Sequence, residues 1–242
     1  MTVTLRLMCS NSTRALLQEL SRGYEARSGQ EVGLEVATAK AVRQRIESGV
    51  SADAVVLGSA MIAELVAAGW LAPQSQRPFA VARVGVAVRR GFPKPDIGSV
   101  AALRQTLVSA RSITHTIEGA SGQYVPALLD RLGIAGALKG RIVTQVGGPV
   151  GPIVVAGEAD LALQQVPELL GIEGLEVVGP IPEEVQRTFE TSTAIFTRSS
   201  RASQARALLD YLAQPAHGEV FRAHGLEPLG WAAPDRRGRV HQ

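Results

Sequence analysis

The chain has 242 residues, of which 45% are hydrophobic and 19% charged, and it carries 25 lysines and arginines against 22 aspartates and glutamates. This composition excludes an intrinsically disordered chain, and a net charge of +3 is too weak to predict binding to nucleic acid. The single cysteine, Cys9, excludes an internal disulfide framework and a metal site built from several cysteines.

The sequence carries no membrane or export signal that we recognise. No apolar run approaches the ~18–20 residues needed to span a bilayer, so we expect no membrane insertion. The first residues, Met1 to Leu7, lack the charged segment, apolar core and cleavage site of a secretory leader. We therefore expect a cytoplasmic chain, or a periplasmic one if a leader was removed from the sequence.

The first third of the chain alternates β-prone runs with amphipathic helical segments. The runs are Val3–Met8, Glu31–Val36 and Ala54–Leu57, the last a continuous apolar run typical of a buried parallel strand. The helical segments are 14–29, which has apolar residues at helical spacing, 38–49 and 61–68. Successive βα units of this kind predict a parallel sheet with helices on its faces.

A second α/β unit follows Pro78. Its β-prone runs are Val81–Val88, Ser112–Ile117, Arg141–Val146, Asp160–Gln165 and Thr193–Phe196, and its helical segments are Val100–Val108, Tyr124–Leu132 and Pro149–Ala156. The segments Ala202–Leu212 and Gly218–Ala223 also predict helices. The basic run Arg236–Arg239 is interpreted as a solvated chain end.

Small polar residues stand where the predicted strands end and helices begin. In open parallel sheets, ligands bind beyond the carboxyl ends of strands, where helix N-termini favour anions. The simpler interpretation is helix capping, the commonest reason for such residues at these places. The junctions are Ser10–Thr13, Ala37–Lys40, Gly58–Ser59, Glu118–Gln123, Gly147–Val150 and Gln164–Gln165.

Lys40, Glu118 and His115 are the charged or titratable candidates beside these junctions. Lys40 lies in the first turn of a predicted helix, where a cation opposes the helix dipole, so we interpret it as a partner for a bound carboxylate. Glu118 and His115 lie at a predicted strand end but have opposite parity along it, so they need not face the same side. The alternatives are a solvated lysine, a capping glutamate and a structural histidine.

Recognised catalytic motifs are absent from the sequence. We find no GxGxxG after a strand, no P-loop, no HExxH and no GxSxG. The four histidines, His115, His217, His224 and His241, have no metal-ligand spacing, and we interpret Cys9 as a core residue. We therefore expect neither a metal nor a cofactor.

Three stretches resemble the periplasmic solute-binding proteins of the molybdate-binding type. The first is 9–16 together with 24–29, which opens Cys-Ser-Asn-Ser-Thr. The others are 37–57, which opens Ala-Thr-Ala-Lys, and 155–160, with its Gly-Glu-Ala-Asp turn. The resemblance implies an α/β fold of two lobes, each a mostly parallel sheet flanked by helices, with a ligand cleft between the lobes. It implies lobe 1 at 1–78 plus 196–242, lobe 2 at 79–195, and crossovers near 79–85 and 190–195.

The resemblance also implies a site made of hydroxyls and backbone N–H groups that holds an anion. The implied ligand-binding residues, together with the junction candidates, are Ser10, Asn11, Ser12, Thr38, Lys40, Ser59, Ser121, Gly148, Val150 and Gln165. Three residues depart from the family: Gln165 stands where the molybdate binders have a tyrosine, Asn11 stands where they have a serine, and Lys40 has no counterpart. A buried group left unpaired costs roughly 1–3 kcal/mol, so we expect a larger ligand with carboxylates.

Two functions remain open at this point, and a third, a ligand-sensing regulatory domain, has no DNA-binding segment in the sequence to support it. The first is a binding protein for a small oxyanion or carboxylate, whose partner would be the membrane component of an ABC importer if the chain is exported. The second is a cytoplasmic isomerase of an unsaturated di- or tricarboxylic acid, because aconitate isomerase of some bacteria is similar to this family. Such an enzyme would use Glu118 or His115 as the base and Lys40 to hold a carboxylate.

Overall fold

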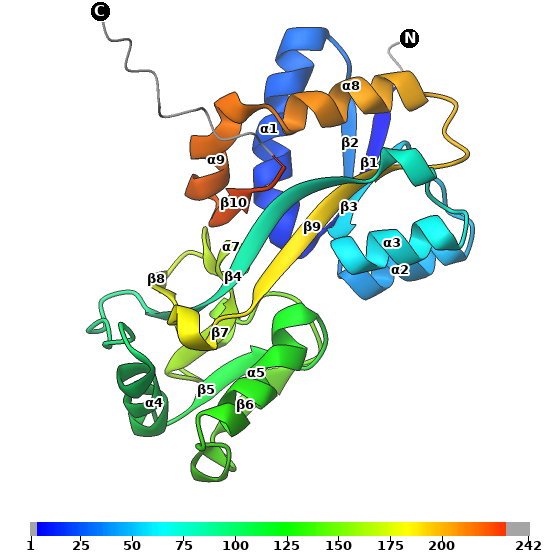
Figure 1. Cartoon of the computed structure of the whole chain (residues 1–242). Coiled ribbons are helices and arrows are strands. Elements are labelled where there is room, and N and C mark those ends of the chain that lie inside the picture. The colour runs from blue at the N-terminus through cyan, green and yellow to red at the C-terminus, as the bar shows by residue number, and fades with distance from the viewer. Residues whose placement is uncertain (1–3, 231–242) are drawn as a thin grey trace, which may run out of the picture.

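The computed structural model describes residues 4–230, whose strands form a 10-stranded sheet in two lobes. Figure 1 shows the two long strands β4 (Arg77–Arg89) and β9 (Thr188–Ile195) running from the upper lobe toward the lower one. The crossovers expected near 79–85 and 190–195 fall within these strands, while the bounds of the lobes stay a prediction. The segment 236–239 lies outside the described residues.

The first lobe has a sheet of order β2-β1-β3-β9-β4, with β10 also paired to β4. The parallel strands β1, β2 and β3 come from the first third of the chain, as predicted. Its strands are β1 (Leu5–Ser10), β2 (Val32–Ala37), β3 (Ala54–Gly58), β9 and β10 (Leu226–Pro228). Its helices are η1 (Asn11–Thr13), α1 (Arg14–Ser28), α2 (Ala39–Glu47), α3 (Ser59–Ala67), η2 (Pro73–Ser75), α8 (Ala202–Leu212), η5 (Pro215–His217) and α9 (Gly218–Ala223).

The second lobe has a sheet of order β4-β7-β5-β6, with β8 on the other edge of β4. Its strands beyond β4 are β5 (Ile113–Thr116), β6 (Ile142–Gln145), β7 (Leu161–Gln165) and β8 (Leu175–Pro180). Its helices are α4 (Val100–Ser109), α5 (Ala120–Arg131), η3 (Gly136–Leu138), α6 (Gly151–Val155), α7 (Val166–Leu169) and η4 (Glu183–Val185). The central strands β7, β5 and β6 are parallel.

Each sheet is covered by helices on both faces, which explains the continuous apolar runs in its strands. In β3, Ala54 and Val56 pack with α1 and α8, whereas Val55 and Leu57 pack with α2 and α3. The second lobe repeats this arrangement, with one cluster under α4 and α5 and another under α6 and α7. The prediction of a buried parallel strand at 54–57 is confirmed, since all four residues are buried.

Several element bounds differ from the predicted ones. The strand expected at 193–196 is longer and begins at Thr188, and β8 and α7 were not predicted at all. β8 begins Leu-Glu-Val-Val after a glycine-containing turn, and its residues are mostly half-buried at the edge of the sheet, so its sequence has little alternation. The helix expected from Tyr124 starts earlier, at Ala120, because glycines near its start obscure the helical pattern.

The start of α5 depends on two glycines. Gly119 has φ +94°, which favours glycine, and it allows the chain to turn sharply from β5 into the helix. A Cβ placed on Gly122 would lie 2.4 Å from the Thr116 carbonyl oxygen, so the first turn of α5 packs directly on the end of β5. This close approach sets the position of the α5 N-terminus at the edge of the second lobe.

Within residues 4–230, no helix combines the length and the apolar character needed to cross a membrane.

Replacing Gly122 by alanine should destabilise the protein by about 1–3 kcal/mol, because the new methyl group overlaps the backbone of β5. Thermal unfolding should show a midpoint about 2–10 °C lower at this chain length. Gly136→Ala is the matched control, because no atom lies within 4 Å of the place that its new Cβ would take and its φ is not positive. Equal midpoints for the two variants would contradict the packing described here.

Candidate functional site

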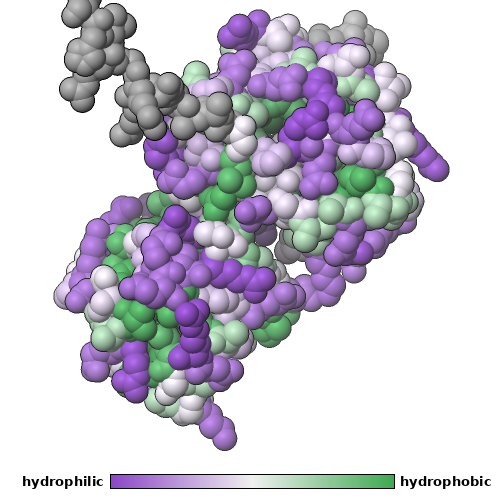
Figure 2. Space-filling view, in the orientation of Figure 1, coloured by the Kyte–Doolittle hydropathy of each residue, from purple (hydrophilic) through white to green (hydrophobic). Residues whose placement is uncertain are grey.

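The small polar junctions all lie where a strand of one sheet ends and a helix begins. Each of β1, β2, β3, β5, β6 and β7 is followed by a junction that leads into a helix. The carboxyl ends of neighbouring parallel strands share one edge of a sheet, so each lobe presents its junctions together. Figure 2 shows the molecule hollowed between the upper and lower lobes.

An ion pair joins the junctions of the two lobes. The Nζ atom of Lys40, in the first turn of α2, lies 2.6 Å from Oε1 of Glu118, just before α5. The Lys40 side chain is 61% exposed and that of Glu118 35%, so solvent screens the pair and its net contribution to stability is about 0–1 kcal/mol. The cation at an unfavourable place in α2 is thus balanced by a carboxylate from the other lobe.

Two further contacts bring the lobes together near this ion pair. A Cβ on Gly147, in the loop before α6, would lie 3.4 Å from Cγ2 of Thr38, the residue that begins α2. The short helix α7 contacts η1 of the first lobe. One region between the lobes therefore contains the N-terminal ends of five helices, namely η1, α2, α5, α6 and α7.

The hydroxyl groups at the junction are largely engaged within the protein. The Thr38 Oγ1 accepts the Ala41 N–H at 3.2 Å and so caps α2, as the simpler interpretation predicts. Ser10 and Ser12 lie 3.3 Å apart through their hydroxyl oxygens, and Ser59 lies 2.8 Å from Ser192. A hydroxyl both donates and accepts, so these groups keep capacity for a further hydrogen bond. Ser121 is buried in the first turn of α5, and Asn11 is half-buried at the start of η1.

Side-chain amides organise the loop before α6. The Gln164 Oε1 accepts the Val150 N–H at 3.0 Å, and its Nε2 donates to the Gly148 carbonyl at 2.9 Å. The same Nε2 lies 2.8 Å from Oε2 of Glu168, and Nε2 of Gln165 donates to Oε1 of Glu168 at 3.2 Å. The Val150 N–H, expected to face a ligand, is therefore held by Gln164 in this structure.

Glu168 was not predicted as a site residue, although it lies beside several that were. Burial raises the pKa of its carboxyl from 4.5 to about 7, while the hydrogen bond from Gln164 lowers it. The signal in the sequence is weak, because an acid in the first turn of a helix ordinarily serves to cap it. Only its contact with two glutamines at the end of β7 connects it to the junction.

His115 is buried at the end of β5 and has a defined hydrogen bond. Its Nδ1 lies 2.7 Å from the Thr116 carbonyl oxygen, so Nδ1–H donates and Nε2 carries the free lone pair. Burial lowers the pKa of the imidazole, which is therefore neutral at pH 7. Among the described residues, no hydrogen bond or ion pair joins His115 to Glu118.

Cys9 is not a candidate nucleophile. Its side chain is buried in the core of the first lobe, and burial raises the pKa of the thiol to about 12. The interpretation of Cys9 as a core residue is confirmed. Within residues 4–230, no cluster of three or more histidine, cysteine, aspartate or glutamate side chains is arranged to hold a metal ion.

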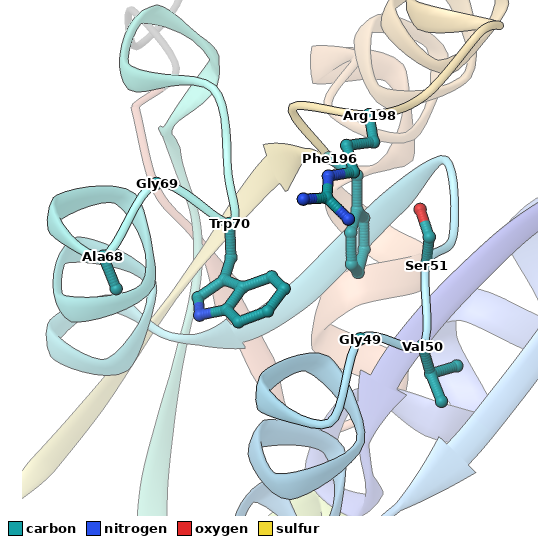
Figure 3. Close-up of a pocket in the computed structure, with 8 residues that line it drawn as sticks. All are labelled: Gly49, Val50, Ser51, Ala68, Gly69, Trp70, Phe196 and Arg198. Atoms are coloured by element: carbon teal, nitrogen blue, oxygen red, sulfur yellow. The ribbon is translucent and has the colours of Figure 1, made fainter.

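Two hollows among the described residues lie away from the strand-to-helix junctions. Trp70, Phe196 and Arg198 border a hollow of about 280 Å³, whose wall includes the loops that follow α2 and α3 (Figure 3). The partial negative charge of the helix C-termini and the positive charge of Arg198 oppose each other here, so the hollow has no clear preference for an anion. A wider groove of about 700 Å³ lies beside Phe92. It is at the amino ends of β5 and β7, and the strand-to-helix junctions are at the carboxyl ends of these strands.

The chain matches known proteins over nearly all of its length. The family model described as bacterial extracellular solute-binding protein matches residues 5–227. An aconitate isomerase from Pseudomonas sp is 32% identical over 232 residues, which cover 93% of this chain and 88% of that protein.

Solved structures with the same fold include two from molybdenum transport systems. The substrate-binding domain of a molybdenum ABC transporter from Clostridium difficile has a TM-score of 0.74 at 15% identity, with 94% of this chain and 99% of that chain covered. The periplasmic molybdate-binding protein of Azotobacter vinelandii has a TM-score of 0.75 at 16% identity, with 92% and 98% covered. At these identities the likeness shows the fold alone, and it confirms the predicted two-lobed α/β architecture.

Replacing Lys40 by alanine should widen the separation of the lobes in the ligand-free protein, because it removes the ion pair between α2 and the start of α5. Double electron–electron resonance between spin labels on Arg22→Cys and Lys139→Cys measures this separation, since both positions are exposed and the buried Cys9 stays unlabelled. We expect the distance distribution to extend to longer values.

Arg43→Ala is the control for this measurement. It removes ion pairs of α2 with Glu47 and Glu64 that lie within the first lobe. Its distance distribution should match that of the parent protein. A Lys40→Ala distribution that is also unchanged would show that the ion pair does not hold the lobes together.

Proposed function

This chain belongs to the family of bacterial extracellular solute-binding proteins, and from that membership we propose that it binds a small anion with two or more carboxylates between its lobes. The observation that carries the proposal is the Lys40–Glu118 ion pair, which brings helix starts of both lobes to one point.

Helix starts supply the electrostatic support for an anion. The backbone N–H groups of the first turn lack partners within a helix, and the helix dipole adds partial positive charge there. α2 and α5 begin on opposite sides of the ion pair, one from each lobe. An anion at this place would therefore interact favourably with both lobes and stabilise their closure.

Glu118 supports a carboxylate rather than a compact oxyanion as the ligand. The Lys40 ammonium already donates a hydrogen bond to the Glu118 carboxylate. A carboxylate of the ligand can take the place of Glu118 and accept the same hydrogen bond. The amide of Gln165 stands where the molybdate binders have a tyrosine hydroxyl, and its NH2 group, one N–H of which donates to Glu168 in this structure, can donate to a wider ligand. We propose that ligand contacts come from Ser10, Asn11, Ser12, Thr38, Lys40, Ser59, Ser121, Gly148, Val150 and Gln165.

In a transport role, the partner would be the membrane component of an ABC importer and the protein would act in the periplasm. Closure of two lobes around a solute produces the shape that such a partner distinguishes from the open form. The importer, the location and the transported solute are all part of this proposal.

Tricarboxylates should stabilise the protein, whereas molybdate, tungstate and sulfate should not. A ligand at 100 times its Kd adds about 2.7 kcal/mol, which raises the thermal midpoint by roughly 5–10 °C at this chain length. The screen uses citrate, trans-aconitate and tricarballylate against the three inorganic oxyanions.

Lys40→Met should lose most of that stabilisation, because it removes the ammonium but keeps the length of the side chain. Lys139→Met is the matched control, since Lys139 is an exposed lysine of the second lobe with no described ion pair. If molybdate raises the midpoint and no carboxylate does, the proposed ligand class is wrong.

A second candidate function is isomerisation of an unsaturated tricarboxylate, and a specific observation favours it. The relative from Pseudomonas sp that is 32% identical over 93% of this chain is an aconitate isomerase. This similarity is far higher than the 15–16% identity to the two molybdenum-system structures. We therefore propose that the bound anion is also a substrate.

The residues at the junction support a proton-transfer reaction. A base removes a proton from the carbon next to the double bond, the electron pair shifts the double bond by one carbon, and a proton returns to the far carbon. Glu118 is the proposed base, with neutral His115 as the alternative because its Nε2 lone pair is free. Lys40 and the N-terminus of α5 would stabilise the negative charge that develops on the substrate carboxylate.

Glu118→Gln should slow isomerisation about 10²–10⁴-fold, the usual contribution of a general base. Proton NMR in D2O measures both the conversion of trans-aconitate to cis-aconitate and the entry of deuterium into the substrate. Glu158→Gln, an exposed acid of the same lobe, should retain the full rate. If His115→Asn loses the rate and Glu118→Gln keeps it, His115 is the base. Tight binding without exchange would leave only the solute-binding function.

A further inference from the structure

We propose that Glu168 is a positioning residue whose protonation turns the Gln165 amide toward the bound anion, so that anion binding is accompanied by proton uptake. This inference rests on the proposed function, because it concerns the same space between the lobes. It goes further by assigning a pH dependence to anion binding and a role to a residue outside the predicted site.

The hydrogen bonds of Glu168 match its ionised form. Both carboxylate oxygens accept from side-chain amides, Oε2 from Gln164 at 2.8 Å and Oε1 from Gln165 at 3.2 Å. A neutral carboxyl has one O–H donor, so one of these amides would face a donor instead of an acceptor. The hydroxyl oxygen of a neutral carboxyl is a poorer acceptor than a carboxylate oxygen, so protonation weakens one of these hydrogen bonds and favours rearrangement of one of the two glutamines.

Gln165 is the glutamine that can rearrange. The Gln164 amide is held at both ends, since its oxygen accepts the Val150 N–H and its nitrogen donates to the Gly148 carbonyl. The Gln165 amide is bound only through Glu168 among the contacts described. Rotation of that amide by half a turn lets its oxygen accept the Glu168 O–H, and its NH2 group then points away from Glu168.

The position of α7 makes the rotated amide useful to a ligand. Gln165 is the N-cap of α7, and α7 contacts η1 of the opposite lobe. The NH2 group that leaves Glu168 is thus placed at the junction where the anion is proposed to bind. Protonation also removes a negative charge that would repel that anion.

Within residues 4–230, no ion pair gives Glu168 a counter-charge. α7 packs against β4, β7, β8 and η1, and the turn before β10 lies against it at Gly225. None of the charged side chains near these contacts has a described contact with Glu168, and several of them are paired with other groups. These side chains are Arg14, Arg77, Arg83, Arg89, Glu176, His224 and Glu227. Burial is therefore the dominant influence, and it places the pKa of Glu168 at about 7, where the proton can exchange under ordinary conditions.

The direction of the pH effect follows from which form of Glu168, neutral or ionised, predominates at each pH. Neutral Glu168 predominates below pH 7 and favours the anion-binding arrangement, so affinity should rise as the pH falls from 8 to 6. The variant Glu168→Gln imitates the neutral form, because its amide donates to the Gln165 oxygen and accepts from Gln164. It should therefore bind anions at pH 8 as the parent protein does at pH 6.

Calorimetric titration with tricarballylate at pH 6, 7 and 8 tests this inference in the parent protein and in Glu168→Gln. The ratio of the two Kd values cancels the titration of the tricarboxylate itself. We expect the ratio of parent to variant to increase roughly tenfold between pH 6 and pH 8, within the limit of tenfold per pH unit for one proton. Glu173→Gln, an exposed acid just beyond α7, should keep the pH dependence of the parent. A constant ratio would overturn the inference.

A second measurement needs no ligand and separates this inference from the proposed function. The side-chain NH2 signals of Gln165, assigned through their loss in Gln165→Ala, should shift with a midpoint near pH 7 in the parent and stay constant in Glu168→Gln. If they shift but tricarballylate does not bind at any pH, the proposed ligand fails and the proton-controlled amide stands. If they do not shift, the inference is wrong whatever binds.

Discussion

The shared strand β4 is the constraint on which the arrangement of the whole molecule depends. Residues 77–83 pair with β9 in the first sheet, and residues 84–89 pair with β7 and β8 in the second. A continuous hydrogen-bonded strand cannot slip in register without turning its side chains to the wrong face. β4 therefore fixes which ends of the two sheets face each other, and the strand-to-helix junctions of both lobes meet as a result.

Charges of both signs lie where the strand-to-helix junctions of the two lobes meet. Several helix starts favour negative charge there, and Lys40 adds a formal positive charge. Glu118 balances the lysine from the other lobe, while Glu168 is held by two amides and has no ion-pair partner among the described residues. The proposed carboxylate ligand would replace Glu118 on Lys40 and favour the neutral form of Glu168.

Local patterns were enough to predict the alternation of strands and helices and the polar junctions. The buried run at 54–57 and the capping residue Thr38 have the roles that short-range chemistry assigns to them. The long-range features were harder. β8 has little periodicity because it lies at a sheet edge. The proposed role of Glu168 depends on Gln164, whose amide is oriented by the loop before α6, and on Gln165, whose amide is not. The ion pair of Lys40 joins residues 78 positions apart, so no local pattern could predict its partner.

The return of the chain to its first lobe has a consequence for synthesis. The core of that lobe combines Leu5 and Leu7 of β1 with Leu208 and Leu212 of α8 and Phe221 of α9. A ribosome releases these helices only after the whole second lobe has emerged, so the first lobe cannot complete its core before the second lobe has been synthesised. The second lobe, built from the middle of the chain, is free to fold earlier. Although synthesis begins with the first lobe, the second lobe is thus the first to have its whole sequence available for folding.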